Sequence, residues 1–529
     1  MPRNARFFIH GINDVRLPSK MLCRARSMKM NPMGYKTVKT DNTSQYARPT
    51  KDIPGPKALP FLGNSFRFMP FIGEYYNVNV LTLMRMLRDK YGNIVKLDGP
   101  TQEQPRIFLF SPELCQEMYQ LQGKWPSRIS LEPLHYYRQS REHIYNGQYG
   151  LVTSQGESWQ DFRSKVTLPM MRPDIVKTYA RQINEITSDL VEKLPALRDP
   201  KILELPSGFM NELYKWSLEM MCSIALNCRM GCLKRNLAVD SEPQQMINCV
   251  QEAFDLIYRL ENLPSLWKVY NTRNLKKLFH ALDTINAISE KHVEFAKTKF
   301  LETADNTNLK DRSILEKLLS IDKQTAHVMA LDILMSTDTT SNAAGALLYY
   351  IANNVEKQEK LREEAISVLP DKTTPITEDI LKNVPYVKAC IKESMRLFPI
   401  VSGILRTMQT QVPIGGYTIP EGSNVMACHA LLSMDSIYFP EPEKYIPERW
   451  MRGNLEYVSY KKLHPYVYMP FGYGVRSCVG QRVAEMELMI FILKVVRNFR
   501  IEWHYGPLEY KSQIVNSVTS PLRFKIIDL

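Results

Sequence analysis

One cysteine stands among residues whose types and spacing suit a flat, acidic ligand: Cys478, within the segment Phe471–Gly480. A thiol just before a helix N-terminus meets unpaired backbone N–H groups and the positive end of the helix dipole, which favour thiolate over thiol. Gly474 and Gly480 lack a Cβ atom, so the backbone can turn sharply and approach a ligand closely. Arg476 can pair with an acidic group on that ligand. The combination predicts a haem site with a thiolate ligand.

The alternative for a single cysteine is a buried structural residue, because free cysteine is among the most buried residue types. The residues around Cys478 argue against that alternative. The segment resembles the haem-ligand signature of the cytochrome P450 family, Phe-x-x-Gly-x-Arg-x-Cys-x-Gly, and matches every fixed position. The resemblance implies haem b with its iron bound by Cys478, and Phe471 and Gly480 beside the cofactor.

Further donors suit the two propionates of such a cofactor. Trp159 and Arg163 lie one helical turn apart, and an indole N–H and a guanidinium are pure donors. Unaided, the pair is equally well explained as a surface pair without a role. By resemblance to the family's Trp-x-x-x-Arg segment, both bind one propionate. Arg406 resembles the second propionate-binding arginine, and Arg476 gives a third arginine for the two carboxylates.

An acid and two alcohols interrupt an otherwise apolar helix that we expect over about residues 328–348: Asp338, Thr339 and Thr340. Such groups are costly to bury unless they have a role. In the family, the pair matching Asp338 and Thr339 relays protons during oxygen activation. Where the family has Ala-Gly, this chain has Met335-Ser336, and the segment is one residue short. The alternative is a helix kink with threonine hydroxyls bonded to the backbone.

A second set of residues has a predicted structural role. Glu393 and Arg396 lie three residues apart in an apolar helix, where their side chains share a face. Arg449 belongs to Pro447-Glu-Arg-Trp450, which resembles the family's Pro-Glu-Arg-aromatic element. The resemblance implies a buried ionic cluster of Glu393, Arg396 and Arg449 that fixes the loop before Cys478. A solvated surface pair is the alternative.

Three cations predict a partner protein. Lys388 and Lys392 lie one helical turn apart, where like charges are slightly destabilising, and Arg482 follows the ligand loop. A solvated helix face is the usual explanation. Members of the mitochondrial clan of the family, arthropod types included, resemble this segment and receive an acidic [2Fe-2S] ferredoxin there. That implies electrons from NADPH–ferredoxin reductase through the ferredoxin.

Charge and cysteine usage point to the mitochondrion. Residues 1–40 hold nine Lys or Arg residues against one acid, Asp14, and supply +8 of the formal net charge of +13. We expect a transit peptide there, with a disordered basic tail as the alternative, and a catalytic domain at 41–529. The small remaining charge gives no reason to expect nucleic acid. Nine scattered cysteines indicate a reducing compartment, and Cys228 and Cys232 are interpreted as core or surface residues.

No run approaches the roughly 20 apolar residues that span a bilayer. The basic leader and the resemblance to the mitochondrial clan imply a peripheral protein on the matrix side of the inner membrane. The segment Leu263–Trp267 could enter the membrane surface, and a buried loop is the alternative.

The elements that must position these residues are mostly helical. The sequence predicts helices over 81–91, much of 161–369 and 479–496, and short strands at 94–97, 107–110 and after Pro399. The fold class is therefore mostly α with small β-sheets, a single large catalytic domain, as the P450 fold requires.

The implied reaction is insertion of one oxygen atom of O2 into a small apolar substrate, a steroid-like hormone precursor or a xenobiotic. We expect the substrate to pass residues 124–150 and 254–270. A haem-thiolate isomerase or dehydratase, which needs neither oxygen nor electrons, and a non-catalytic haem-binding protein are the alternatives.

Overall fold

The computed structural model describes residues 47–100, 103–172, 174–235, 237–262, 266–303, 312–453 and 462–529. These residues fall within one compact unit, 46–529. The predicted transit peptide, 1–40, lies outside them, and so does part of the segment 263–267.

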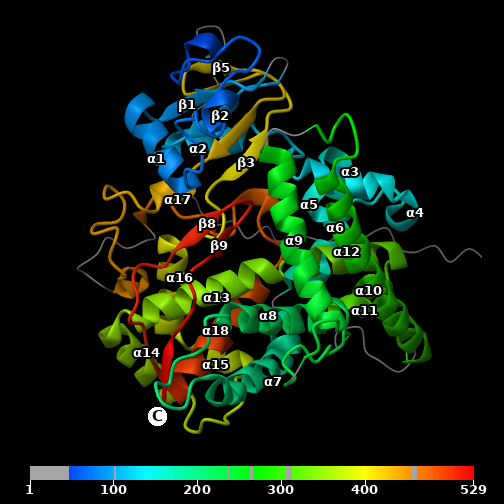
Figure 1. Cartoon of the computed structure of the whole chain (residues 1–529), viewed down its shortest axis with the longest axis vertical. Coiled ribbons are helices and arrows are strands. Elements are labelled where there is room, and N and C mark those ends of the chain that lie inside the picture. The colour runs from blue at the N-terminus through cyan, green and yellow to red at the C-terminus, as the bar shows by residue number, and fades with distance from the viewer. Residues whose placement is uncertain are drawn as a thin grey trace, which may run out of the picture. The chain divides into compact units, whose positions relative to one another are not determined.

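Helices dominate the described chain (Figure 1). They are α1 (Val80–Tyr91), α2 (Pro112–Leu121), α3 (Glu132–Ser140), α4 (Glu142–Tyr145), α5 (Gly150–Thr153), α6 (Gly156–Met171), α7 (Asp174–Leu197), α8 (Phe209–Ala225), α9 (Glu242–Asn262), α10 (Arg273–Thr303), α11 (Ile314–Leu319), α12 (Lys323–Leu334), α13 (Thr337–Ala352), α14 (Val355–Val368), α15 (Glu378–Lys382), α16 (Pro385–Leu397), α17 (His429–Leu432) and α18 (Gln481–Asn498). Local sequence explains several starts: the Asn79 side chain caps α1, and Ser313 with Glu316 forms a capping box at α11.

The strands form small sheets. One four-stranded sheet has the order β1 (Ile94–Leu97), β2 (Arg106–Leu109), β6 (Asn424–Ala427) and β3 (Ile404–Thr407), with only β2 and β6 parallel. Three pairs complete the set: β4 (Val412–Ile414) with β5 (Tyr417–Ile419), β7 (Phe499–Glu502) with β10 (Lys525–Asp528), and β8 (Tyr510–Ser512) with β9 (Asn516–Val518). The predicted fold class, mostly α with small sheets, is confirmed.

The helix that follows the ligand loop is central to the main hydrophobic core. α18 packs against α7, α13, α14 and α16, and its buried side includes Met486, Ile490 and Phe491. Trp216 of α8 contacts Phe491 with ring centroids 4.7 Å apart. Because α18 is held on several sides, the loop that leads into it is held as well.

The predicted continuous helix over 328–348 is wrong. α12 ends at Leu334 and α13 begins at Thr337, with Met335 and Ser336 between them. Hydroxyls compete for the backbone at this break: Thr337 Oγ1 donates to the Leu334 carbonyl at 2.8 Å, and Thr339 Oγ1 donates to the Ser336 carbonyl at 2.7 Å. The back-bonded threonines of the alternative interpretation are therefore present.

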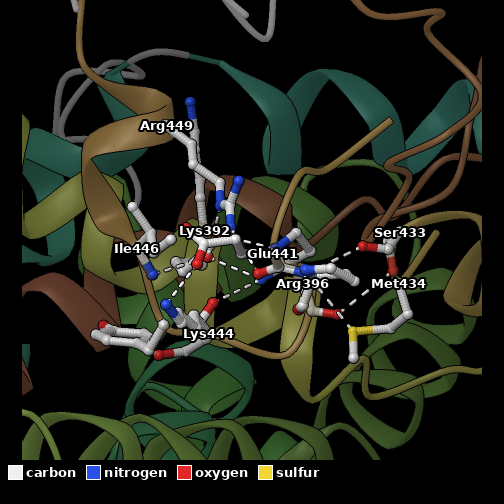
Figure 2. Close-up of polar contacts among 12 residues, drawn as sticks. Lys392, Arg396, Ser433, Met434, Glu441, Lys444, Ile446 and Arg449 are labelled. Atoms are coloured by element: carbon white, nitrogen blue, oxygen red, sulfur yellow. Dashed lines mark hydrogen bonds and ion pairs between the residues drawn. The ribbon is translucent and has the colours of Figure 1, made fainter. Parts of the chain in front are cut away.

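The predicted ionic cluster is buried between α16 and the 3-10 turn Pro447–Trp450 (Figure 2). Arg396 binds Glu393 with both Nε and Nη2, at 2.9 and 2.8 Å, and Arg449 Nε lies 3.3 Å from Glu393 Oε1. The Ile446 N–H and the Trp450 indole donate to the same carboxylate, at 3.0 and 2.9 Å. Glu393 and Arg396 have no exposed surface. The solvated surface pair is excluded.

The Glu393→Gln substitution should cost about 3–5 kcal/mol of unfolding free energy, because it leaves two buried guanidinium groups without a carboxylate. Guanidinium unfolding of the holoprotein, followed by far-UV circular dichroism, measures the loss. Glu441→Gln is the matched control: that exposed side chain pairs with Lys444 at the surface, and its unfolding midpoint should change far less. Equal midpoints for the two variants would contradict the structural role of Glu393.

Candidate functional site

The loop around Cys478 turns back on itself before α18. The Cys478 N–H donates to the Phe471 carbonyl at 2.9 Å, and Gly472 and Gly474 adopt φ of 76° and 74°. These angles lie in the left-handed region, which explains glycine at position 474. Gly480, the N-cap of α18, has a φ of −88°, so backbone conformation does not require glycine there. The half-buried Phe471 packs against the main core.

The Cys478 thiol is accessible and yet poorly solvated. Among the described cysteines it is the one with an exposed side chain. Burial nevertheless raises its pKa, and this outweighs the hydrogen bond from Gly480 and the nearby charges of Arg163 and Arg128. The N–H group at the helix terminus thus favours the thiolate, as the sequence analysis expects, but desolvation of the charged form has the larger effect on the pKa of Cys478. Coordination to a metal ion would deprotonate such a thiol.

Four arginines lie in this region: Arg128 and Arg163 are close enough to affect the thiol, and Arg406 and Arg476 lie near these two arginines. Arg128, Arg163, Arg406 and Arg476 form no ion pair within the described parts of the chain. Burial lowers the pKa of all four, and for Arg406 and Arg476 the like charges of neighbouring guanidinium groups lower it further. A buried cationic cluster of this kind is stabilised by an anionic ligand. The residues present therefore fit the propionates of haem.

Hydrogen bonds fix the orientation of two of these arginines. Arg476 Nε donates to the Pro126 carbonyl at 2.8 Å, whereas its Nη1 has no acceptor among the described residues. Arg406 Nε donates to Gln122 Oε1 at 2.7 Å. Each guanidinium is thus held by neutral acceptors, which leaves its charge available for a ligand.

Trp159 contributes a surface as well as an N–H group. Its buried ring lies beneath the Arg476 guanidinium, 3.9 Å from the ring centroid, in a cation–π contact. Arg163, one turn further along α6, lies with Nη2 3.5 Å from Met171 Sδ. The structure thus brings Trp159, Arg163 and Arg476 to one site. The predicted hydrogen bonds from Trp159 and Arg163 to a propionate stay a prediction.

Sequence reasoning missed Arg128. It lies in the connection between α2 and α3, where Gln155 Oε1 accepts its backbone N–H at 2.9 Å and Gln155 Nε2 donates to its carbonyl at 2.8 Å. Its Nε has no acceptor in the described part of the chain, and the nearby Asp332 pairs with Arg138 at 2.7 Å. Only the fold brings this residue to the site, because Pro-Ser-Arg in a loop carries no local signal.

The acid and the alcohol at the start of α13 have different surroundings. Asp338 is buried, receives hydrogen bonds from Tyr214, Asn342 and Ser517, and has a pKa that burial raises. Thr339 is half-buried, and its hydroxyl donates to the Ser336 carbonyl. Asp338 is thus able to carry a proton at neutral pH more readily than an exposed aspartate.

A second buried acid next to this pair was also missed. Glu487 of α18 is fully buried, and its Oε2 accepts from Thr340 Oγ1 at 3.3 Å, while its Oε1 has no donor among the described residues. Burial raises the pKa of Glu487 to about 8. The sequence around Glu487 is that of an ordinary helix and has no feature from which its contact with Thr340 could be predicted.

The three predicted partner-binding cations lie on α16 and α18, which pack together. Lys388 and Lys392 are half-buried, and both are within electrostatic range of Glu485 of α18. The Lys388 ammonium donates to the Lys382 carbonyl at 2.9 Å. Arg482 is exposed. The two lysines are thus less solvated than a bare surface pair.

An accessible cysteine before a central helix, with four carboxylate-free arginines around it, defines a protein of the haem-thiolate class. Comparison with known proteins agrees: the family model for cytochrome P450 matches residues 53–526. The chain belongs to the cytochrome P450 family. It is a monooxygenase, an oxidoreductase that carries haem through a cysteine thiolate.

Three similar curated proteins come from flies. Cytochrome P450 CYP12A2 of Musca domestica is 36% identical over 500 residues, which cover 92% of each chain. Probable cytochrome P450 12b2, mitochondrial, of Drosophila melanogaster is 35% identical, with 92% of this chain and 91% of the relative covered. Probable cytochrome P450 301a1, mitochondrial, of the same species is 34% identical, with 91% and 88% covered. These names support the expected mitochondrial location.

Replacing Cys478 with serine should abolish the strongly red-shifted Soret band of the ferrous carbon monoxide complex, because that shift requires a thiolate ligand. Difference spectroscopy of the reduced protein measures it. Cys249→Ser, which removes a half-buried thiol elsewhere in the chain, should leave the band intact. A wild-type protein whose band is not shifted would contradict the assignment of Cys478.

The Glu487→Gln variant should lose part of the pH dependence of stability. The folded-state pKa of about 8 lies above the unfolded value near 4.5, so the folded wild type binds more protons and loses stability as pH rises from about 4.5 to about 8. The amide does not titrate. Between pH 4.5 and about pH 8, the free energy of unfolding of the variant should therefore rise relative to that of the wild type by up to about 4 kcal/mol. Denaturant unfolding at pH 5.5 and 8 measures this, with the exposed Glu509→Gln as control. Identical pH slopes for wild type and Glu487→Gln would refute the raised pKa.

Proposed function

We propose that this chain is a mitochondrial monooxygenase that inserts one oxygen atom of O2 into a C–H bond of a small apolar substrate, with electrons from a [2Fe-2S] ferredoxin. The observation that carries the proposal is the accessible Cys478 thiol in a region with four arginines that pair with no carboxylate of the described residues. Arg406 and Arg476 are buried, and Arg128 and Arg163 are half-buried. Steroid-like hormone precursors and xenobiotics are the proposed substrate classes.

In this proposal the residues of the chain have separate roles. Cys478 ligates the iron, and Arg128, Arg163, Arg406, Arg476 and Trp159 hold the propionates. Bound haem supplies the chemistry of oxygen activation, and a thiolate ligand favours O–O cleavage. Burial raises the pKa of Asp338, which favours its protonated form, and the Thr339 hydroxyl, which donates to the Ser336 carbonyl, lies next to it in the chain. The two side chains together pass protons toward the reacting oxygen.

Electrostatics support an acidic electron donor. Lys388, Lys392 and Arg482 lie on two packed helices, and α18 leads back to Cys478. Long-range attraction between opposite charges speeds association and weakens with salt. We therefore propose that the ferredoxin binds at these cations. The ferredoxin receives electrons from NADPH through its reductase and passes them to this protein.

The helices and the exposed apolar side chains both bear on how the protein contacts a membrane. In the described part of the chain, no helix combines the length and apolar character that crossing a bilayer requires. Several apolar side chains of the segments 59–76 and 266–270 are exposed, namely Phe61, Phe71, Ile72, Leu266, Val269 and Tyr270. Trp267, in contrast, is buried and donates to the Leu260 carbonyl. We propose peripheral contact with the inner membrane on its matrix side through the exposed side chains, which liposome flotation checks.

The break at Met335 and Ser336 favours one alternative function, a haem-thiolate isomerase or dehydratase, because it alters the segment that serves oxygen activation in the family. Turnover separates the two functions. A monooxygenase needs oxygen, NADPH, ferredoxin and reductase, and substrates can be chosen by the spin-state change of the haem. A product formed without electrons would overturn the proposal.

The double variant Lys388→Gln/Lys392→Gln should lose most ferredoxin-supported turnover, on the order of tenfold, and keep turnover driven by peroxide. Only the first assay requires docking. Lys276→Gln/Lys277→Gln, which removes two exposed charges from α10, is the charge-matched control and should behave as wild type. Equal losses in both assays would show that Lys388 and Lys392 serve folding or cofactor binding instead.

A further inference from the structure

A cysteine, a histidine and a glutamate lie in line away from the haem site. Cys228 follows α8, Glu242 begins α9 and His292 belongs to α10. Cys228 Sγ lies 3.6 Å from His292 Nδ1, and His292 Nε2 lies 3.4 Å from Glu242 Oε2. The sequence-based view of Cys228 and Cys232 as core or surface residues missed this histidine, which comes from 64 residues away.

The position of Cys228 is fixed by the turn that ends α8. Leu226 is the C-cap, and Asn227 adopts the left-handed conformation with a φ of 52°, which reverses the chain direction. The next residue, Arg229, binds Asp189 of α7 at 2.5 Å and Glu219 of α8 at 2.8 Å. Cys228 is therefore held between two anchored neighbours rather than on a free loop.

Glu242 determines which ring nitrogen of His292 carries the proton. Lys291 binds Glu242 Oε1 and holds the pKa of this carboxyl below its usual range, so Glu242 is ionised. An ionised carboxylate facing Nε2 favours a proton on Nε2, which leaves Nδ1 free to accept one. The Nδ1 atom faces the Cys228 sulfur. A nucleophile, a base and a group that orients the base are thus arranged as in enzymes with activated thiols.

The resting thiol needs this base. Burial, together with the negative charges of Glu219 and Glu242, raises the pKa of Cys228 to about 11, so the sulfur is protonated at neutral pH. Reaction therefore requires that the proton leave as the new bond forms. The three residues are not closed off from solvent: Cys228 is half-buried, and the His292 and Glu242 side chains expose 21% and 40% of their surface.

We propose that Cys228 is a covalent modification site for soft carbon electrophiles of the α,β-unsaturated carbonyl class, with His292 as the base and Glu242 as its orienting partner. The sulfur forms a bond to the β-carbon of the alkene as its proton passes to His292 Nδ1. The electrons of the C=C bond move to the α-carbon, which takes a proton from the imidazolium. The addition is redox-neutral and releases nothing.

Metal binding is the other chemistry that such residues offer. Across the residues that the structure describes, no three His, Cys, Asp or Glu side chains are arranged to hold a metal ion. The neighbouring thiols Cys222 and Cys232 are buried, and burial raises the pKa of each. Cys228 is therefore the thiol of this region that an electrophile can reach.

Brief labelling of the folded holoprotein with N-ethylmaleimide, quantified by peptide mass spectrometry, tests the proposal. Cys249 of α9 is the internal control, since it is half-buried as well and burial raises its pKa, but its hydrogen-bond partner is Thr284 rather than a histidine. Cys228 should react at least tenfold faster than Cys249. The His292→Gln variant should lower the Cys228 rate at least tenfold and leave the Cys249 rate unchanged.

Glu242→Gln provides a second measurement that keeps the thiol and the imidazole. It should slow labelling of Cys228 several-fold, and an unchanged carbon monoxide spectrum shows that either variant is folded. Equal rates at Cys228 and Cys249 in the wild type would overturn the proposal. So would a Cys228 rate that neither His292→Gln nor Glu242→Gln changes.

Discussion

The buried carboxylate of Glu393 is the constraint on which the haem-ligand region depends. It accepts hydrogen bonds from Arg396, Arg449, Trp450 and the backbone of Ile446, and so joins α16 to the turn at 447–450. The ring of Trp450 contacts Tyr468, whose hydroxyl donates to the Lys392 carbonyl of α16. The chain that leads to Cys478 is thereby attached to α16 at both places. Such a charge is tolerated in the core because nearly every donor and acceptor around it is used.

The positive charges at the site are not balanced by carboxylates of the described residues. Four guanidinium groups share a buried region with one thiol whose pKa burial raises, and no acid among the described residues pairs with them. Two carboxylates and a metal ion would compensate both imbalances, since the carboxylates pair with arginine and the metal ionises the thiol. Under the proposed function, the positive charge of these arginines is thus complementary to the negative charge of the haem propionates.

Sequence patterns correctly predicted those helices and strands that are determined by their own local sequence. The helix at 80–91, the strand at 94–97 and the helix after Cys478 follow from local periodicity and agree closely with the structure. Arg128 and Glu487 were missed because their partners lie far away in the chain, 147 residues for Glu487 and Thr340. The break at Met335 was predicted only as the alternative to a continuous helix. Apolar periodicity continues across it, whereas the hydroxyls of Thr337 and Thr339 take the carbonyls that a continuous helix would use.

Two thiols of this chain illustrate how surroundings select chemistry. Cys478 has two cations and the N–H group of Gly480 near it, and in the proposed function its proton is lost to a metal, so that the sulfur becomes a ligand. Cys228 has acids near it and an imidazole in contact, so its proton is lost to a base and the product is a nucleophile. Burial raises the pKa of both, and exposure alone does not distinguish them. The group that takes the proton therefore decides which reaction each sulfur undergoes.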